Sequence, residues 1–193
     1  LDVRDVGARR GLQIQVEALA EAEVRRDPAV APNADGRVAR FLEDLGGQRG
    51  LLMSIDDIRR HILPKQKKMA DLAKHYGIRV FYHTDGDVQS VIPDLINVTG
   101  IELLNPIQWR CPSMEREGLV RDFGDKIIFH GAMDNQQTLP FGTVEDVRAE
   151  VLENVRIFSG ARWICAPCHN LQPITPTENI VAMYETIHEY GRL

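Results

Sequence analysis

Cysteine is scarce in this 193-residue chain, with only Cys111, Cys165 and Cys168. A small, odd number of cysteines argues against the disulfide framework of small secreted domains and favours a reducing cytoplasm. No apolar run approaches the roughly 20 residues that a membrane-spanning helix needs. The N-terminal residues do not show the charged, apolar and small-residue succession of a signal peptide. We therefore expect a cytoplasmic protein with no membrane partner.

The chain also lacks a strong excess of one charge and any low-complexity tract. Its formal net charge is -5, and its basic residues are scattered rather than clustered. Nucleic-acid binding normally requires a basic patch or stripe, so no nucleic-acid partner is expected. With 44% hydrophobic and 26% charged residues, the composition is that of an ordinary globular domain that can bury a sizeable core.

Short apolar runs alternate with amphipathic segments over most of the chain. Each apolar run has the length of a strand, and each following segment has apolar residues at helical spacing. Strands followed in turn by helices predict a parallel β/α architecture. The segment 1–37 does not follow this pattern and reads as a helix plus a loop. The predicted strands and their loops lie in residues 38–50, 78–86, 101–108, 126–134 and 162–170, and the predicted helices in 54–77, 88–100, 114–124, 143–160 and 175–191.

Polar side chains stand where each apolar run stops. In parallel β/α folds the chemistry gathers at the C-terminal ends of the strands, so five such ends in succession predict a shared pocket. Simpler roles are open as well: Asp85 and Asp134 suit helix caps, and His130 suits a strand residue bonded to the backbone. The polar residues at these ends include Asp44, Gln48, His83, Asp85, Asn105, Gln108, His130, Asp134, Cys168, His169 and Asn170.

The stretch from Cys165 to His169 fits C-x-x-C-H, which occurs in c-type haem attachment, redox pairs and zinc sites. Its place on a buried strand argues against a redox pair, which sits where a helix begins, and a zinc ribbon would need a second C-x-x-C. Cys165 is therefore predicted in the core. His83 and Asp85 at one strand end, with Cys168 from another, match the three protein ligands of a catalytic zinc site.

Several long motifs resemble the uroporphyrinogen decarboxylase superfamily, in the right order from about Val38 to the C-terminus. They are "DLGGQRGLLMS", "HTDG", "GIELLNPIQ", "FHGAMDNQQTLPFGTVEDV" and "APCHNLQPITPTENIVAMYE". The resemblance implies a (β/α)8 TIM barrel, of which residues 38–193 carry roughly strands four to eight. A barrel needs eight units, and the chain supplies five. It is therefore expected to be part of a barrel, or to associate as a homo-oligomer that completes one.

The superfamily holds two kinds of enzyme. Uroporphyrinogen decarboxylase acts on a tetrapyrrole without a cofactor, through Asp and Arg residues of the first two strands. The corrinoid-dependent methyltransferases bind zinc with His-x-Cys on strand five and a Cys near strand eight, and the zinc activates a thiol. Here His83 matches the zinc His, Cys168 the distal Cys, and Asp85 replaces the first Cys. His169 matches a strand-eight His near the decarboxylase pocket.

The stretch "GAMDNQQTLPFGT" is more similar to the methyltransferase branch. We therefore expect a metal-assisted methyltransferase that uses zinc and acts on a small molecule with a corrinoid or thiol acceptor, the corrinoid being carried by a partner protein. The second expectation is a cofactor-free decarboxylase. A non-catalytic binding subunit or an inactive barrel fragment is a third interpretation. The predicted site has catalytic residues His83, Asp85 and His169, metal ligands His83, Asp85 and Cys168, and substrate-binding residues Asp44, Gln48, Asn105, Gln108, Asp134 and Asn170.

Overall fold

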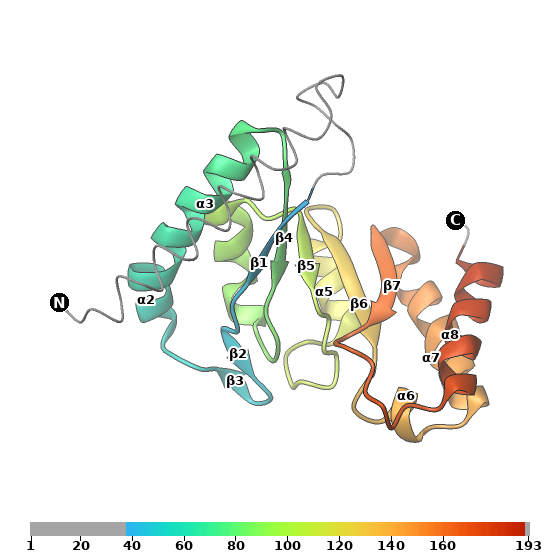
Figure 1. The fold of residues 1–193 in the computed structure, drawn as a ribbon. Helices are drawn as coiled ribbons and strands as arrows, with labels where there is room; N and C mark the ends of the chain where they lie inside the picture. The colour runs from blue at the N-terminus through green and yellow to red at the C-terminus, as the bar shows by residue number, and fades with distance from the viewer. Residues whose placement is uncertain (1–37, 192–193) are drawn as a thin grey trace.

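The structure, a computed structural model, describes residues 38–191 and contains a five-stranded parallel sheet (Figure 1). The helix and loop predicted for residues 1–37 lie outside the described residues. All five predicted strands are present and are neighbours in the order β1-β4-β5-β6-β7. They are β1 (Val38–Leu42), β4 (Arg79–His83), β5 (Leu103–Asn105), β6 (Ile128–Met133) and β7 (Trp163–Pro167). The parallel β/α prediction is confirmed.

Helical segments connect each strand to the next, and a small hairpin follows β1. The hairpin pairs β2 (Gly46–Gly47) with β3 (Gly50–Leu51). The helical segments are α2 (Ile55–Asp57), η1 (Ile58–Ile62), α3 (Leu63–His75), η2 (Gln89–Val91), α4 (Ile92–Asp94), η3 (Leu95–Thr99), α5 (Arg116–Phe123), α6 (Thr138–Phe141), α7 (Val144–Ile157), η4 (Phe158–Gly160) and α8 (Thr177–Tyr190). Among the described residues, no helix is both long and apolar enough to cross a membrane.

The first predicted helix is interrupted before Pro64. Ser54 caps its start by accepting a hydrogen bond from the Asp57 amide, and a π-helical turn, η1, runs directly up to the α-helix that contains the proline. Proline has no amide hydrogen to donate within a helix, and a wider π turn accommodates that missing bond. The predicted interruption at Pro64 is therefore confirmed.

The last helix begins one residue later than its sequence suggests. Thr175 followed by Pro176 is typical of an N-cap and first helical residue, but the structure has Pro176 as N-cap of α8. Thr175 is buried, and its amide donates to the carbonyl of Gln172, so it belongs to the preceding turn. That turn removes Thr175 from the helix.

Alternating residues of the strands face opposite sides of the sheet. Phe41 of β1 pairs with Tyr82 of β4, and both are buried in the main hydrophobic core. Their neighbours Arg40 and Phe81 pair on the other face, where the Arg40 side chain is exposed. Since strand side chains alternate with a period of two, one face carries the core and the other carries polar groups.

The sheet is not closed into a barrel by residues 38–191. β1 and β7 are its two edges, and each carries an exposed apolar side chain, with Leu42 65% and Ile164 44% accessible. A second, smaller core lies where α7 and α8 pack next to the end of β6 (Figure 1). Exposed edges and apolar groups are usually covered by further structure. The homo-oligomer predicted from the sequence stays a prediction.

The β2–β3 hairpin packs directly on the loop that follows β4. Gly86 in that loop has φ +84°, and a Cβ at this position would lie 2.5 Å from the carbonyl oxygen of Gly47. A Cβ on Gly46 would in turn meet the Asp85 carbonyl oxygen at 2.7 Å. The backbone of the hairpin and the backbone of the loop after β4 therefore come into direct contact, and each has a glycine at the contact. This explains why "DLGG" and "HTDG" occur in the same sequence.

Substitution of Gly86 by Ala should strongly destabilise the fold. The left-handed conformation and the backbone overlap together should lower the free energy of unfolding by about 1–3 kcal/mol or more. Urea denaturation measures this difference. Gly160→Ala is the matched control, because no atom lies within 4 Å of the place that its Cβ would take and a change below about 0.5 kcal/mol is expected there. Equal effects at the two positions would contradict the tight packing.

Candidate active site at the strand ends

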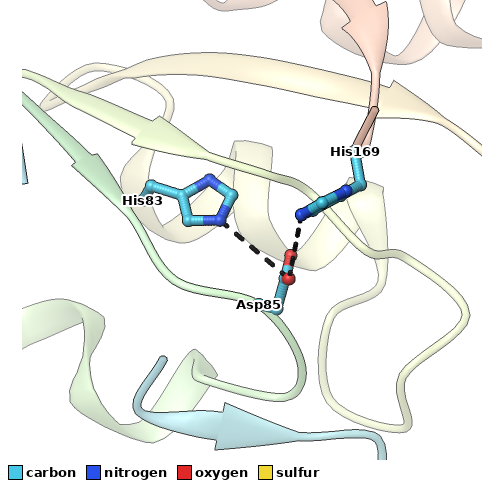
Figure 2. A group of neighbouring side chains, drawn as sticks. All are labelled: His83, Asp85 and His169. Carbon is cyan, nitrogen blue, oxygen red and sulfur yellow. Dashed lines mark ion pairs between the residues drawn. The ribbon is translucent and has the colours of Figure 1, made fainter. Parts of the chain in front are cut away.

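His83, Asp85 and His169 meet at the C-terminal end of the sheet. His83 is the last residue of β4, Asp85 follows it in the loop, and His169 comes two residues after β7. Their potential ligand atoms all lie within 4.8 Å of one another. His83 Nε2 and His169 Nε2 are each 3.9 Å from Asp85 Oδ2, and Figure 2 shows the three side chains pointing toward a common centre.

The orientation of His83 is fixed by Asn105. The Asn105 Nδ2 lies 2.9 Å from His130 Nδ1 and 3.4 Å from the carbonyl oxygen of His130, an atom that can only accept. The amide oxygen Oδ1 therefore faces His83 Nδ1, at 2.6 Å. Because that oxygen accepts and is much nearer to Nδ1 than the Arg40 Nη2 at 3.4 Å, we assign the hydrogen to His83 Nδ1, which leaves the lone pair of Nε2 on the side of Asp85. This is the arrangement that prepares a histidine to bind a metal.

His130 is the neutral end of this hydrogen-bonded chain. Burial lowers the pKa of His130, and the nearby Arg40 and His83 lower it further. A neutral imidazole can accept on Nδ1 from the Asn105 amide. His130 therefore acts through Asn105 to hold His83, which goes beyond the simple strand role open from the sequence.

The loop of Asp85 is held by hydrogen bonds from its backbone amides to two side chains. One oxygen of the Asp85 carboxylate has no partner among the described residues. Its amide donates to Asp44 Oδ1 at 3.1 Å, and the amide of Gly86 donates to Gln108 Oε1 at 2.6 Å. Asp85 Oδ1 is buried and has no hydrogen-bond partner within residues 38–191. A buried polar atom is normally paired, and this oxygen shares its lack of a partner with Gln66 Oε1 and Trp109 Nε1 in the described part of the chain.

The surroundings disfavour the charge on Asp85. Burial raises the pKa of its carboxyl, His83 lowers it, Asp44 raises it further and His169 lowers it. A carboxylate oxygen without a hydrogen bond in a partly desolvated place is stabilised by a bound cation.

Cys168, the third metal ligand expected from the sequence, is not part of this group. Its thiol donates to the carbonyl oxygen of Ile107 at 3.3 Å, and only 4% of the residue is accessible. Burial raises the pKa of the Cys168 thiol, whereas a metal ligand must be a thiolate. The next residue, His169, is the third member of the group, while Cys168 lines the neighbouring cavity, and its role as a metal ligand stays a prediction. Cys165, predicted in the core, is partly buried and packs against the second core from its edge, and burial raises its pKa to about 12.

Most of the predicted substrate-binding residues support other residues of the site, and one lies exposed at the rim of the cavity. Asp44 and Gln108 brace the loop of Asp85, and Gln48 lies 3.5 Å from Gln108 through its amide nitrogen. Asn105 orients His83. Of the predicted set, only Asn170 is both exposed and at the rim of the cavity beside the site.

Asp134 is a structural residue in this fold. Its carboxylate accepts hydrogen bonds from Arg110 and from the amides of Gln136 and Thr138, at the start of α6. It is buried, with 5% of its surface accessible. These bonds fit the simpler interpretation, in which Asp134 stabilises the start of α6, although Gln137 is the N-cap residue. Its carboxylate is not a member of the three-residue group, and its predicted role in substrate binding stays a prediction.

A cavity of about 440 Å³ lies on the open face of the sheet next to these residues. It receives side chains from all five strands or the loops after them, among them Arg40, Phe81, His83, Asn105, His130 and His169. This volume is typical of a small-molecule site. Arg40 was not predicted as a site residue, although a lone arginine inside the apolar strand "VARFL" was a signal for it.

Comparison with known proteins identifies the family. Residues 38–190 match the uroporphyrinogen decarboxylase family, and the chain belongs to it. Among solved structures, a methyltransferase from Methanosarcina mazei is similar, with a TM-score of 0.65 and 22% identity. The match covers 83% of this chain and 45% of the methyltransferase, so the chain spans less than half the length of that relative. No curated protein sequence matches the chain significantly.

The Asn105 contact makes a prediction about the protonation of His83. In its neutral form His83 should carry its hydrogen on Nδ1, and long-range ¹H–¹⁵N correlation spectra would show this. In Asn105→Ala the preference should be lost, since the accepting oxygen is gone, while signals of His75 on α3 should not change. Protonation of His83 on Nε2 in the unsubstituted protein would contradict the assignment.

Asp85→Asn should stabilise the metal-free protein at neutral pH. The raised pKa of Asp85 means that the folded state disfavours the ionised carboxylate relative to the unfolded chain, whose Asp pKa is about 3.9. The gain should therefore be present at pH 7 and should disappear as the pH falls below about 4, where both states hold a neutral acid. Urea unfolding at several pH values measures it.

The matched control for this change is Asp125→Asn. Asp125 is exposed in the turn before β6, so its substitution should alter the free energy of unfolding by less than about 0.5 kcal/mol. A loss of stability in metal-free Asp85→Asn at pH 7 would show that the carboxylate is satisfied within the protein.

Proposed function

We propose that the protein is a metal-assisted methyltransferase whose zinc is held by His83, Asp85 and His169. The observation that carries the proposal is the convergence of these three groups, with Asp85 Oδ1 buried and unpaired among the described residues. Two imidazoles and a carboxylate are a known donor set for catalytic zinc, which keeps a fourth position for water or substrate. A bound zinc would lower the pKa of a thiol acceptor and so supply the nucleophile.

The spacing of the three groups supports this assignment. Ligand atoms about 2.1 Å from a tetrahedral zinc lie roughly 3.4 Å apart, and those of the site are within 4.8 Å. Side-chain movement on the order of 1 Å brings them to that spacing. The exposed side chain of His169, 43% accessible, can make this movement.

The protein residues would have separate tasks in the reaction. His83 presents Nε2 because Asn105 holds its other nitrogen, and Asp85 is held in place by Asp44 and by the glycines of its loop. Asn170 and Arg40 line the neighbouring cavity and are available to the substrate. The methyl donor proposed here is a corrinoid carried by a partner protein, which would approach the site from the C-terminal ends of the strands.

Metal analysis of protein purified without chelator or affinity metal tests the proposal. About one zinc per chain is expected, and His83→Ala or His169→Ala should lose most of it. Cys168→Ala should keep its zinc, because the thiol donates to a backbone carbonyl and is not a member of the three-residue group. Inductively coupled plasma mass spectrometry gives the ratios.

Two results would contradict this assignment. Zinc retained in His169→Ala but lost in Cys168→Ala would restore the cysteine as ligand. A folded protein without metal, even after incubation with excess zinc, would remove the metal site. Cofactor-free decarboxylation and a purely binding role would then be separated by measuring release of carbon dioxide from uroporphyrinogen.

A further inference from the structure

Arg40 is a cation on the open face of the sheet. Its guanidinium carbon lies 5.4 Å from the centre of the Phe81 ring, and Nη2 lies 3.4 Å from His83 Nδ1. Within residues 38–191, no carboxylate forms an ion pair with it. Arginine is always charged, and its planar fork of donors matches a carboxylate. The donors of Arg40 are thus available to an anion.

An arginine of the neighbouring strand, β4, forms an ion pair with an acidic residue. Arg79, at the start of β4, lies 3.6 Å from the carboxylate of Glu102. Arg40 lies in the middle of β1, opposite Phe81 and two residues before the strand ends. Arg79 therefore has an acidic partner, whereas Arg40 faces the cavity with no such partner in the described part of the chain.

The cavity around Arg40 is chemically suited to an anion. None of the described residues that line it carries a carboxylate, while Arg40 and three histidines, His83, His130 and His169, do line it. Burial lowers the pKa of His130, and the positive charge of Arg40 lowers it further. Phe81 supplies an aromatic surface beside the guanidinium. An acid that carries a ring would meet both groups.

We propose that Arg40 binds the carboxylate of a small organic acid that occupies the cavity beside His83. The guanidinium donates to the two carboxylate oxygens, and the Phe81 ring contacts the apolar part of the molecule. Arg40 is then the residue that selects an anionic substrate, and the rest of the molecule is oriented toward Asp85 and His169. The role as substrate rests on the proposed function, whereas the binding of the anion does not.

Binding of benzoate to the metal-free chain tests the proposal. The protein is treated with a chelator, and benzoate and its uncharged analogue benzamide are titrated by ligand-detected NMR or calorimetry. Saturable binding of benzoate is expected, and it should be about tenfold or more weaker in Arg40→Met, since a hydrogen bond to a charged group is lost. Benzamide binding should differ little between the two proteins. Arg40→Lys, which keeps the charge without the fork, should lie in between.

Arg79→Met is the matched control, because it removes the same side chain from the neighbouring strand where it is paired with Glu102. It should bind benzoate like the unsubstituted chain. Equal benzoate affinity in Arg40→Met and the unsubstituted chain would overturn the proposal, as would the absence of saturable binding to the latter. Since the titration contains no metal, its result is independent of whether the zinc site exists. A chain that binds benzoate through Arg40 but takes up no zinc would separate the two proposals.

Discussion

The hydrogen bond between His83 and Asn105 is the contact on which the geometry of the site depends. It exists because β4 and β5 pair in parallel with His83 opposite Asn105, at the last residue of both strands. A shift of either strand by one residue would turn its polar side chain to the core face. The same register buries Tyr82 and Leu104 on the other face. Packing of the core and orientation of the His83 imidazole are therefore decided together, and one cannot change without the other.

The loop of Asp85 holds a carboxylate in surroundings that disfavour its charge. The two glycine contacts of this loop and the bond from the Asp85 amide to Asp44 hold the carboxylate where hydration is reduced. An unpaired oxygen in such a place lowers the stability of the empty site, and a cation that binds only the folded chain returns that stability by mass action. A binding site requires a rigidly held group that is free to contact a ligand, and the Asp85 carboxylate has this arrangement within residues 38–191. A structural aspartate such as Asp134 has the opposite arrangement, with its oxygens bonded.

The sequence predicted the strands because each is a short apolar run that ends in a turn, and it predicted the polar strand ends because parallel strands share one functional edge. It did not distinguish His169 from Cys168. The two are adjacent in the chain, and which one faces the other strand ends depends on the backbone just after β7, where the Cys168 amide still bonds to the carbonyl of Met133. Nor did it separate Asp134 from Asp85, since a cap and a ligand have the same residue type. Only the position of Arg110 and of the α6 amides decides that difference.

The open face of the sheet relates the site to the rest of the molecule. In a parallel sheet, side chains on that face meet whatever completes the fold, and here they include exposed Leu42 and Ile164 at the two edges with Arg40 and the three-residue group between them. Apolar groups at the edges and polar groups in the middle are the pattern of a surface that packs at its rim and holds a ligand at its centre. A longer relative, of which this chain covers 45%, has the same fold over this part. Further structure would therefore enclose the cavity without replacing Arg40 or His83, because both already line it from the strands described here.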